Sequence, residues 1–353
     1  MCIYLKDMPE LTYHNREHIF PAGLGGKMKL AKGVVSDQAN ACFSSMELKL
    51  MRQSLIAVDR MMLGPGDRGS LSPKKASKSL VAVGVEENGH PVLSYTSNGK
   101  PYNISQFYVS EQTIRISMQN KHTDISNEKD LFLNALQKYG GIFVHLKSPN
   151  LKDGEMIIGY SDGKYYVATS GTRPETKTVQ AAINLLLSRF SFNGVTEVET
   201  KIQQEHLLVE DQETDRMYAK IAMNALAFIK GADYSLNPAF DDIRNWIVYG
   251  DSEVDYQSLP NIVTTDDNEN RLTHILPPDS HWCIFVKYNS SLSAVVCLYN
   301  HFYRRFVFGK IDDSETSFPF GFICDWKSEK EYTLEQYINV FTMNHLGRDI
   351  ALT

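Results

Sequence analysis

The segment from Glu17 to Asn40 constrains the fold of this 353-residue chain more than any other part of its sequence. An acid and a histidine stand side by side in a short apolar stretch, Glu17-His18-Ile19-Phe20-Pro21, and the run Gly23-Leu24-Gly25-Gly26 follows at once. Closely spaced glycines mark a turn. The sequence therefore predicts a short strand, a glycine turn and, at 33–35, a second short extended segment.

A helix is predicted over about 40–62, with Asp37 or Asn40 as its cap. Its apolar residues recur at helical spacings in two stripes. The first stripe is Phe43, Met46, Leu50 and Ala57, and the second is Leu48, Met51, Leu55, Val58 and Met62. Two stripes predict a helix that is buried on two sides, against which a further part of the chain packs.

Charge is divided unevenly along the chain. Residues 1–80 contain twelve Lys and Arg against seven Asp and Glu, a net charge of +5, whereas the remainder contains 24 basic and 35 acidic residues, a net charge of -11. A basic N-terminal part on an acidic body suits the binding of phosphate groups. A chance imbalance over a short window is the alternative.

The five cysteines are scattered and odd in number, which argues against a disulfide framework and for a cytoplasmic protein. The first ten residues lack the basic start and apolar core of a secretory signal. No apolar run approaches the roughly 18 residues that a membrane span needs. We therefore expect a cytoplasmic protein that does not enter a membrane.

Glu17, His18 and Asn40 have the chemistry that metal-assisted cleavage of a phosphodiester requires. A neutral imidazole, with an ordinary pKa of about 6.5, can accept a proton from water at neutral pH. A carboxylate and an amide oxygen are hard ligands that suit Mg²⁺ or Mn²⁺. The sequence therefore predicts a site for one Mg²⁺ or Mn²⁺ ion.

The arrangement of these residues resembles the HNH endonuclease family, and most closely the branch that reads EHI-x-P-x-x-LGG and then C-x-x-C-N. The resemblance covers about residues 1–62, and weaker likeness extends to 220–224 and 240–244. It implies a two-stranded hairpin and a helix around one divalent cation, the ββα-metal unit. By the same resemblance, Glu17 and Asn40 bind the metal, His18 is the general base, and the products carry 5′-phosphate ends.

The sequence departs from this family at two places. The branch holds a structural zinc between two pairs of cysteines, but only Cys2 remains, with Leu5 in its partner's place and Ser36 and Ala39 in place of the second pair. One thiolate does not make a zinc site, so we expect no structural zinc and a fold held by packing. The middle asparagine of the motif, which orients the histidine in the family, is also missing, and Lys29 or a neighbour stands there.

Several basic residues are candidates for contacts with nucleic acid, DNA more than RNA. Strand alternation would place His14 and Arg16 on the same face as His18, although a solvated strand face is an equal alternative. Six further basic residues could contact the phosphate backbone: Arg52, Arg60, Arg68, Lys74, Lys75 and Lys78. The alternative is that they belong to an ordinary basic linker. Tyr218, Lys220 and Lys230 are further candidates, although their helix is better explained as a core helix. We expect His274, His281 and His301 to be surface or core histidines.

The expected fold class is α+β, in three parts. Residues 1–63 form the ββα-metal nuclease unit, 64–78 a linker or basic loop, and 79–353 a mixed domain with an antiparallel sheet and a possible sub-boundary near 200. Strand patterns lie at 79–118, 141–170 and in three runs between 281 and 309. Helical patterns lie at 177–190, 213–231, 238–247 and 333–345.

The expected function is metal-dependent endonuclease activity on nucleic acid, in restriction or anti-phage defence. One alternative is a catalytically decayed module that binds nucleic acid or a protein without cleavage, which both departures from the family favour. Another alternative makes the domain at 79–353 the centre, where a protein partner or small-molecule signal would bind and control the nuclease.

Overall fold

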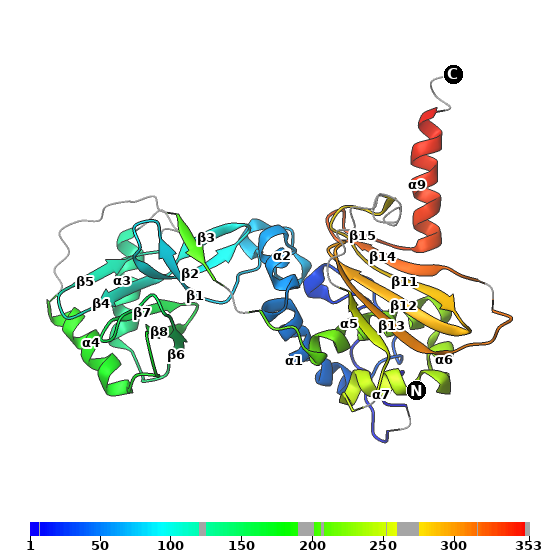
Figure 1. The fold of residues 1–353 in the computed structure, drawn as a ribbon, viewed down its shortest axis with the longest axis horizontal. Helices are drawn as coiled ribbons and strands as arrows, with labels where there is room; N and C mark the ends of the chain where they lie inside the picture. The colour runs from blue at the N-terminus through cyan, green and yellow to red at the C-terminus, as the bar shows by residue number, and fades with distance from the viewer. Residues whose placement is uncertain are drawn as a thin grey trace. The chain divides into compact units, whose positions relative to one another are not determined.

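A computed structural model describes two compact units. One unit contains Met1–Ser77 and Leu208–Thr353, and the other, Lys78–Leu207, is inserted between these parts of the chain (Figure 1). The described residues are 1–6, 8–119, 125–189, 201–205, 208–251, 253–259, 275–315 and 317–349. The described residues form helices and several sheets whose strands are mostly antiparallel, so the predicted α+β class is confirmed.

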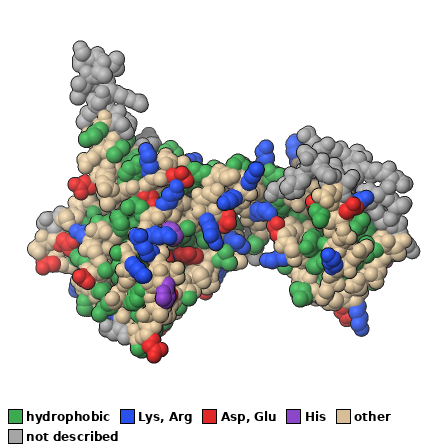
Figure 2. Space-filling model, turned by 180° about the vertical axis from the view of Figure 1, so that it is seen from behind, with side chains coloured by type: hydrophobic (Ala, Val, Ile, Leu, Met, Phe, Trp, Pro, Cys, Tyr) green, Lys and Arg blue, Asp and Glu red, His purple; other side chains and the backbone are tan. Residues whose placement is uncertain are grey.

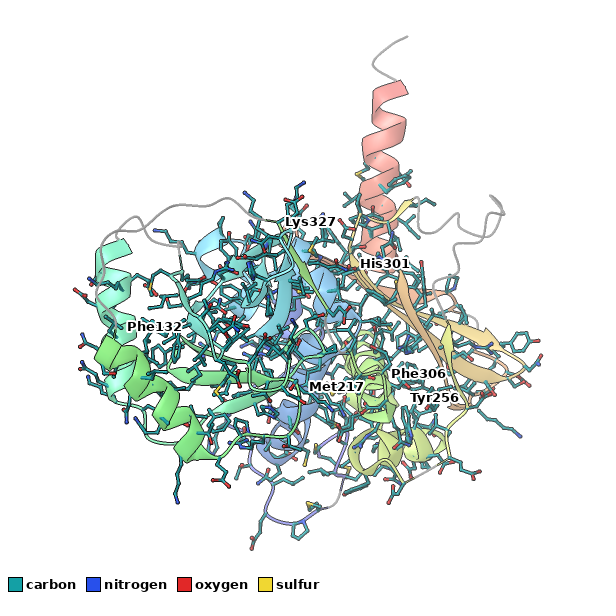
Figure 3. The ribbon with its side chains drawn as sticks, turned by 60° about the vertical axis from the view of Figure 1, so that its left-hand side comes forward. Phe132, Met217, Tyr256, His301, Phe306 and Lys327 are labelled. Carbon is teal, nitrogen blue, oxygen red and sulfur yellow. The ribbon has the colours of Figure 1, made fainter. Side chains whose placement is uncertain are left out.

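The first unit is built on a six-stranded antiparallel sheet in the order β10-β13-β12-β11-β14-β15. Its strands are β10 (Tyr256–Leu259), β11 (His281–Tyr288), β12 (Ser291–Leu298), β13 (Phe302–Lys310), β14 (Phe320–Asp325) and β15 (Lys330–Thr333). The three predicted runs between 281 and 309 are strands β11 to β13, which confirms that prediction. Tyr256 and Phe306 stack across the sheet with ring centroids 6.2 Å apart (Figure 3).

Helix α5 (Gln212–Lys230) packs against this sheet. It begins with a capping box between Asp211 and Thr214 and ends before Gly231, as the pattern at 213–231 predicted. Nearly all of its middle residues are buried, because the sheet covers one side of α5 and α1 (Asp37–Gln53) covers another. The other helices of this unit are α2 (Ile56–Leu63), α6 (Ala232–Ser235), α7 (Asp241–Tyr249) and α9 (Leu334–Asp349), with 3-10 turns η1 (Ala22–Leu24), η2 (Asp67–Gly69), η3 (Pro73–Lys75) and η4 (Pro238–Phe240).

This division differs from the one expected from the sequence. The units divide close to the expected boundary near 78 and to the possible sub-boundary near 200, but residues 208–353 belong with 1–77 and do not form one domain with 79–207. The physical reason is a shared core, in which Phe20 and Phe43 join buried residues of α5 and of the sheet. The segment 64–78, expected as a linker or basic loop, is instead folded onto the first unit, where the Tyr299 hydroxyl donates to the Gly64 carbonyl (2.8 Å).

The helix predicted over 40–62 is two helices, α1 and α2, separated at Ser54 and Leu55. Ser36 caps α1 in place of Asp37 or Asn40, and its Oγ accepts from the Ala39 amide (3.3 Å). The first apolar stripe is buried, as expected. The prediction of burial on two sides is wrong, because three residues of the second stripe are exposed: Leu48, Leu55 and Met62.

The described residues of the inserted unit form two sheets and two helices. A four-stranded sheet contains β1 (Ala82–Glu86), β2 (Pro91–Ser97), β3 (Lys100–Asn103) and β9 (Ile202–Gln204). A five-stranded sheet contains β4 (Ser105–Val109), β5 (Ile114–Ser117), β6 (Val144–Lys147), β7 (Met156–Ser161) and β8 (Lys164–Thr169). Helices α3 (Ile125–Gln137) and α4 (Thr176–Arg189) contribute Phe132 and Ile183 to the core against the second sheet. The strand patterns and the helix at 177–190 are confirmed, whereas α3 was not predicted.

Candidate functional site

The Glu17-His18 segment forms one side of a short hairpin. The Ile19 amide donates to the Met28 carbonyl (3.0 Å), and the Leu30 amide donates to the Glu17 carbonyl (2.8 Å). These two bonds place His18 directly opposite Lys29. The predicted extended segment at 33–35 is therefore wrong, because the strand that pairs lies at 28–30.

The glycine turn that joins the two sides is held from several directions. At Gly26 an added Cβ would lie 2.0 Å from the Phe20 carbonyl oxygen, so only glycine fits. Arg60 Nε donates to the Gly23 carbonyl (2.8 Å), which takes this guanidinium away from the contact with nucleic acid that we expected of it. His281 Nε2 lies 3.1 Å from the Leu24 carbonyl.

His281 is a neutral core histidine, as expected. The Tyr299 amide donates to its Nδ1 (2.9 Å), so Nε2 carries the proton and donates to Leu24. Burial lowers the pKa of this imidazole to about 3. His301 lies at the surface beside Asp59, as expected, and His274 lies outside the described residues.

The lowered pKa of His281 predicts that the first unit loses stability in acid. The unfolded chain protonates this imidazole below pH ~6.5 and the folded chain does not, so stability is complete above that pH and is lost as the pH falls toward about 3. Each pH unit within this window costs about 1.4 kcal/mol. Urea unfolding between pH 6 and 4.5 should depend on pH less steeply in His281→Gln than in the wild type. Equal pH dependence of the two proteins would contradict this assignment.

Glu17 is fixed by a lysine that lies 203 residues away in the sequence. Lys220 of α5 is fully buried, and its ammonium donates to Glu17 Oε1 and to Glu47 Oε1 of α1 (2.5 Å for Glu47). The ammonium also lies 5.4 Å from the ring centroid of Phe43. Burial opposes the charge of Lys220, but Glu47 and Glu17 outweigh burial and raise its pKa, so the group stays an ammonium.

The main chain of His18 is fixed from the same helix. Asn224, one turn after Lys220, donates from Nδ2 to the His18 carbonyl (2.9 Å). Tyr4 in turn donates to Asn224 Oδ1 (2.6 Å) and orients the amide. The expectation of a core helix at Tyr218 and Lys220 is thus confirmed, and one face of that helix supports the motif.

The His18 imidazole is half-buried and neutral. Burial, and then the nearby charges of Lys29 and Lys220, lower its pKa to about 4, whereas Glu47 acts in the opposite direction. Because His18 and Lys29 form a pair without hydrogen bonds between them, their side chains lie close on one face of the hairpin. Lys29 therefore lies opposite His18 on the hairpin.

Asn40 lies in the first turn of α1, and its Oδ1 atom is buried without a hydrogen-bond partner. Such an atom is costly to bury, because a carbonyl oxygen loses its bonds to water without replacing them. Asn40 precedes Glu47 by seven residues, which puts both on the same face of the helix, about two turns apart. The amide oxygen thus lies on the helix face that Lys220 connects to Glu17.

Glu17 and Asn40 carry the kind of oxygen donors that a hard divalent cation prefers. Within the described ranges no group of three His, Cys, Asp or Glu side chains can hold a metal, but an amide oxygen is also a ligand for Mg²⁺. The oxygen of Asn40 needs a partner, and the bond from Lys220 to Glu17 uses Oε1. Glu17 and Asn40 are the residues that would hold such an ion.

Cys2 is hydrogen-bonded to Ser36 at the start of α1. The thiol of Cys2 accepts from the amide and the hydroxyl of Ser36, both at 3.4 Å. Cys2, Ser36 and Ala39 are fully buried. These residues therefore form a closed cluster at the start of α1.

The first two candidates for nucleic-acid contacts are placed differently from the prediction. Residues 14–16 form no strand, because the His14 and Asn15 amides donate to the Asp37 carboxylate (2.8 and 3.0 Å). His14 is exposed. Arg16 is exposed but donates to the carbonyls of Leu30 (2.8 Å) and Lys29 (3.0 Å), so its guanidinium crosses the hairpin.

The other basic candidates are exposed side chains on the same unit: Arg52, Arg68, Lys74 and Lys75. Arg68 lies in a loop that contacts the glycine turn, since a Cβ added at Gly69 would lie 2.7 Å from the Ala22 carbonyl oxygen. On the face drawn in Figure 2, blue Lys and Arg side chains gather around purple His side chains. Contact of Arg52, Arg68, Lys74 and Lys75 with phosphate therefore stays a prediction.

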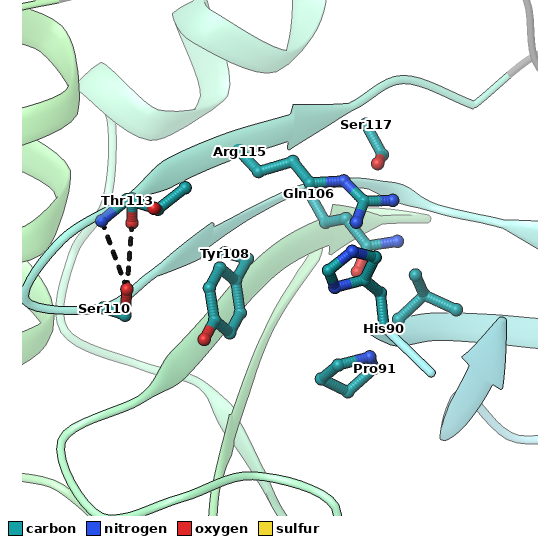
Figure 4. A pocket seen from close by; sticks show the side chains of 9 residues that line it. His90, Pro91, Gln106, Tyr108, Ser110, Thr113, Arg115 and Ser117 are labelled. Atoms are coloured by element: carbon teal, nitrogen blue, oxygen red, sulfur yellow. Dashed lines mark hydrogen bonds between the residues drawn. The ribbon is translucent and has the colours of Figure 1, made fainter. Parts of the chain in front are cut away.

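The inserted unit has a small pocket of its own (Figure 4). Its polar side chains bond within the fold: Arg115 pairs with Glu86 (2.7 Å), and Gln106 bonds the Leu93 amide and carbonyl (2.6 and 2.8 Å). The pocket is lined by His90, Pro91, Val92, Gln106, Tyr108, Ser110, Thr113, Arg115 and Ser117. Because Arg115 and Gln106 of this pocket already bond to other parts of the inserted unit, we place the candidate site in the first unit.

The supporting role of three residues was not identified from the sequence, although 220–224 was noted as a weak likeness and Lys220 as a possible contact with nucleic acid: Glu47, Lys220 and Asn224. A signal was present, since Lys220 interrupts the apolar run Met217-Tyr218-Ala219-Lys220-Ile221-Ala222-Met223. A lysine in such a run needs a buried partner, but the sequence does not say which one. None of the described helices is long and apolar enough to cross a membrane.

Comparison of the chain with protein-family models, with curated proteins and with solved structures finds no match.

Proposed function

We propose that the first unit is a metal-dependent HNH-type endonuclease that hydrolyses phosphodiester bonds, with DNA as the favoured substrate. The observation that carries the proposal is the buried Oδ1 of Asn40, which has no hydrogen-bond partner. The hairpin that holds His18 and the helix that begins at Asp37 support it, because they have the order of a ββα-metal unit.

In the proposed reaction, Glu17 and Asn40 hold one Mg²⁺ or Mn²⁺ ion. Such an ion, when bound, polarises a phosphoryl oxygen and neutralises charge on the leaving oxygen. His18 accepts the proton of the attacking water, a role that requires the neutral imidazole. The exposed basic residues Arg68, Lys74 and Lys75 bind the phosphate backbone beside the glycine turn.

The experiment is plasmid cleavage by the purified chain with Mg²⁺ or Mn²⁺, beside a reaction in EDTA and a His18→Ala variant. Cleavage that needs the ion and His18 supports the proposal. Activity against plasmid but not against single-stranded RNA would support DNA as the substrate. A role in restriction or anti-phage defence is part of the proposal and is tested by phage plating on cells that express the wild type or the variant.

A second candidate function is a module that binds nucleic acid or a protein without cleavage. The observation that favours it is the bond from Lys220 to Glu17, which places a permanent cation on the carboxylate that the nuclease needs for its metal. Binding of duplex DNA with no cleavage under any divalent ion would support this second function.

A further inference from the structure

Lys29 presents a positive charge beside His18 without a carboxylate to neutralise it. The side chain is exposed and lies opposite His18 on the hairpin. In the part of the chain that the structure describes, no carboxylate pairs with its ammonium, whereas Lys27 pairs with Glu329 at 2.7 Å. The fold therefore keeps one cation free at the imidazole.

Arg16 is a second exposed cation on the same hairpin. Its guanidinium donates to the carbonyls of Lys29 and Leu30 and remains exposed. Across the described ranges, Arg16 also has no ion pair with a carboxylate. Lys29 and Arg16 are thus two exposed cations on the hairpin that carries the neutral imidazole, and an anion bound there would gain from both.

We propose that Lys29 binds the scissile phosphate beside His18 and neutralises the charge that develops there. This inference rests on the proposed function. An ammonium is a common phosphate ligand, and it acts as a point charge on a flexible stem. A fixed cation at a developing negative charge stabilises the transition state more than the ground state.

The position of Lys29 explains why a lysine can stand where the HNH resemblance expects an asparagine. An amide at this position would orient the histidine. Here the His18 main chain is held by Asn224 instead (2.9 Å). The residue opposite the imidazole is therefore released from that task and is placed to contact the substrate.

The test compares Lys29→Met and Lys29→Arg with Lys32→Met, which removes an exposed lysine outside the hairpin pairing. Two quantities are measured: the cleavage rate at saturating DNA with Mg²⁺, and the salt dependence of duplex binding in EDTA by fluorescence anisotropy. We expect Lys29→Met to lower the rate by about 100-fold. Its slope of log K against log salt should fall by about 1. Lys29→Arg should keep most of both quantities, and Lys32→Met should match the wild type in rate.

The outcomes separate this inference from the proposed function. Wild-type cleavage that Lys29→Met retains, with an unchanged salt slope, overturns the inference and leaves the nuclease proposal standing. No cleavage by the wild type, with a salt slope that falls in Lys29→Met, overturns the nuclease and supports the phosphate contact. If the slope of log K against log salt falls as much in Lys29→Arg as in Lys29→Met, the positive charge of Lys29 has no role in binding.

Discussion

Replacing Lys220 with methionine is expected to lower the free energy of unfolding of the first unit by about 3–5 kcal/mol, the range for breaking a buried ion pair by removal of one partner. Glu17 and Glu47 would keep their charges without the ammonium that now bonds both. The Glu17 and Glu47 side chains are only 13% and 24% exposed, so water can replace only part of the stabilisation that the ammonium gives them. The measurement is urea unfolding followed by tryptophan fluorescence, which reports on this unit because all three tryptophans lie in it: Trp246, Trp282 and Trp326.

Lys49→Met is the matched control. Lys49 also pairs with two carboxylates, Asp211 and Glu213, but these lie at the surface with 36% and 49% of their side chains exposed. Exposed pairs contribute about 1 kcal/mol or less, so this variant should unfold close to the wild type. Adding Glu17→Gln and Glu47→Gln to Lys220→Met should recover part of the loss, because no buried charge is then left unpaired. If Lys220→Met unfolds at the wild-type urea concentration, the buried triad does not stabilise the unit as described.

Replacing His18 with alanine is expected to lower the cleavage rate by about 10²–10⁴-fold, the range for loss of a general base. The fold should survive, because Asn224 bonds the main-chain carbonyl of His18 and not its imidazole. Tryptophan-detected unfolding of the variant checks this. His90→Ala, which removes an exposed histidine of the inserted unit, is the control. A variant without the imidazole that cleaves at the wild-type rate would exclude His18 as the base.

The lowered pKa of His18 also fixes how the rate should depend on pH. The base acts in its neutral form, which is present above its pKa, so the rate should fall only as the pH drops toward about 4. If the imidazole had its ordinary pKa, the cleavage rate would instead fall about tenfold for each pH unit below ~6.5. The experiment measures the cleavage rate at saturating Mg²⁺ between pH 5 and 8. A steep fall below 6.5 would show that burial, Lys29 and Lys220 do not hold this group neutral in the active protein.

Local patterns in the sequence predicted most of the secondary structure of the first unit. Helix α5 combines a helical period, a capping residue and a terminal glycine, and these signals agree. The strand pairing at 28–30 was missed because β-branched Val34 and Val35 favoured a strand at 33–35. In the structure the Val34 carbonyl instead accepts from the Ile3 amide (3.0 Å), a contact between distant residues that no local pattern reports.

The joining of residues 208–353 with 1–77 in one unit could not be predicted for a related reason. The inserted residues 78–207 separate two parts of the chain that share one core, and a reading along the sequence assigns the second part to the domain that it follows. The two apolar stripes of the helix at 40–62 did indicate a further packing partner. That partner, α5, covers the stripe that contains Phe43 and leaves Leu48 exposed.

One part of the candidate site comes from a short segment of the sequence, and another part comes from residues far away in the sequence. Glu17, His18 and Asn40 were named from their spacing in a short segment, and Lys29, named beside them, does pair with His18. Lys220 reaches Glu17 only because two helices far apart in sequence pack together. Buried charges mark such contacts, but only coordinates identify the partner.

The central claim is that Glu17 and Asn40 hold one divalent ion beside His18, and Mn²⁺ binding followed by electron paramagnetic resonance tests it without requiring cleavage. The titration compares the wild type with Asn40→Ala, after unfolding experiments have shown that the variant folds. We predict one Mn²⁺ site on the wild-type chain and an affinity lower by about tenfold or more in the variant, the loss typical of damage to a metal's ligand shell. Absence of Mn²⁺ binding by the wild type, or equal affinity of the two proteins, would contradict the claim.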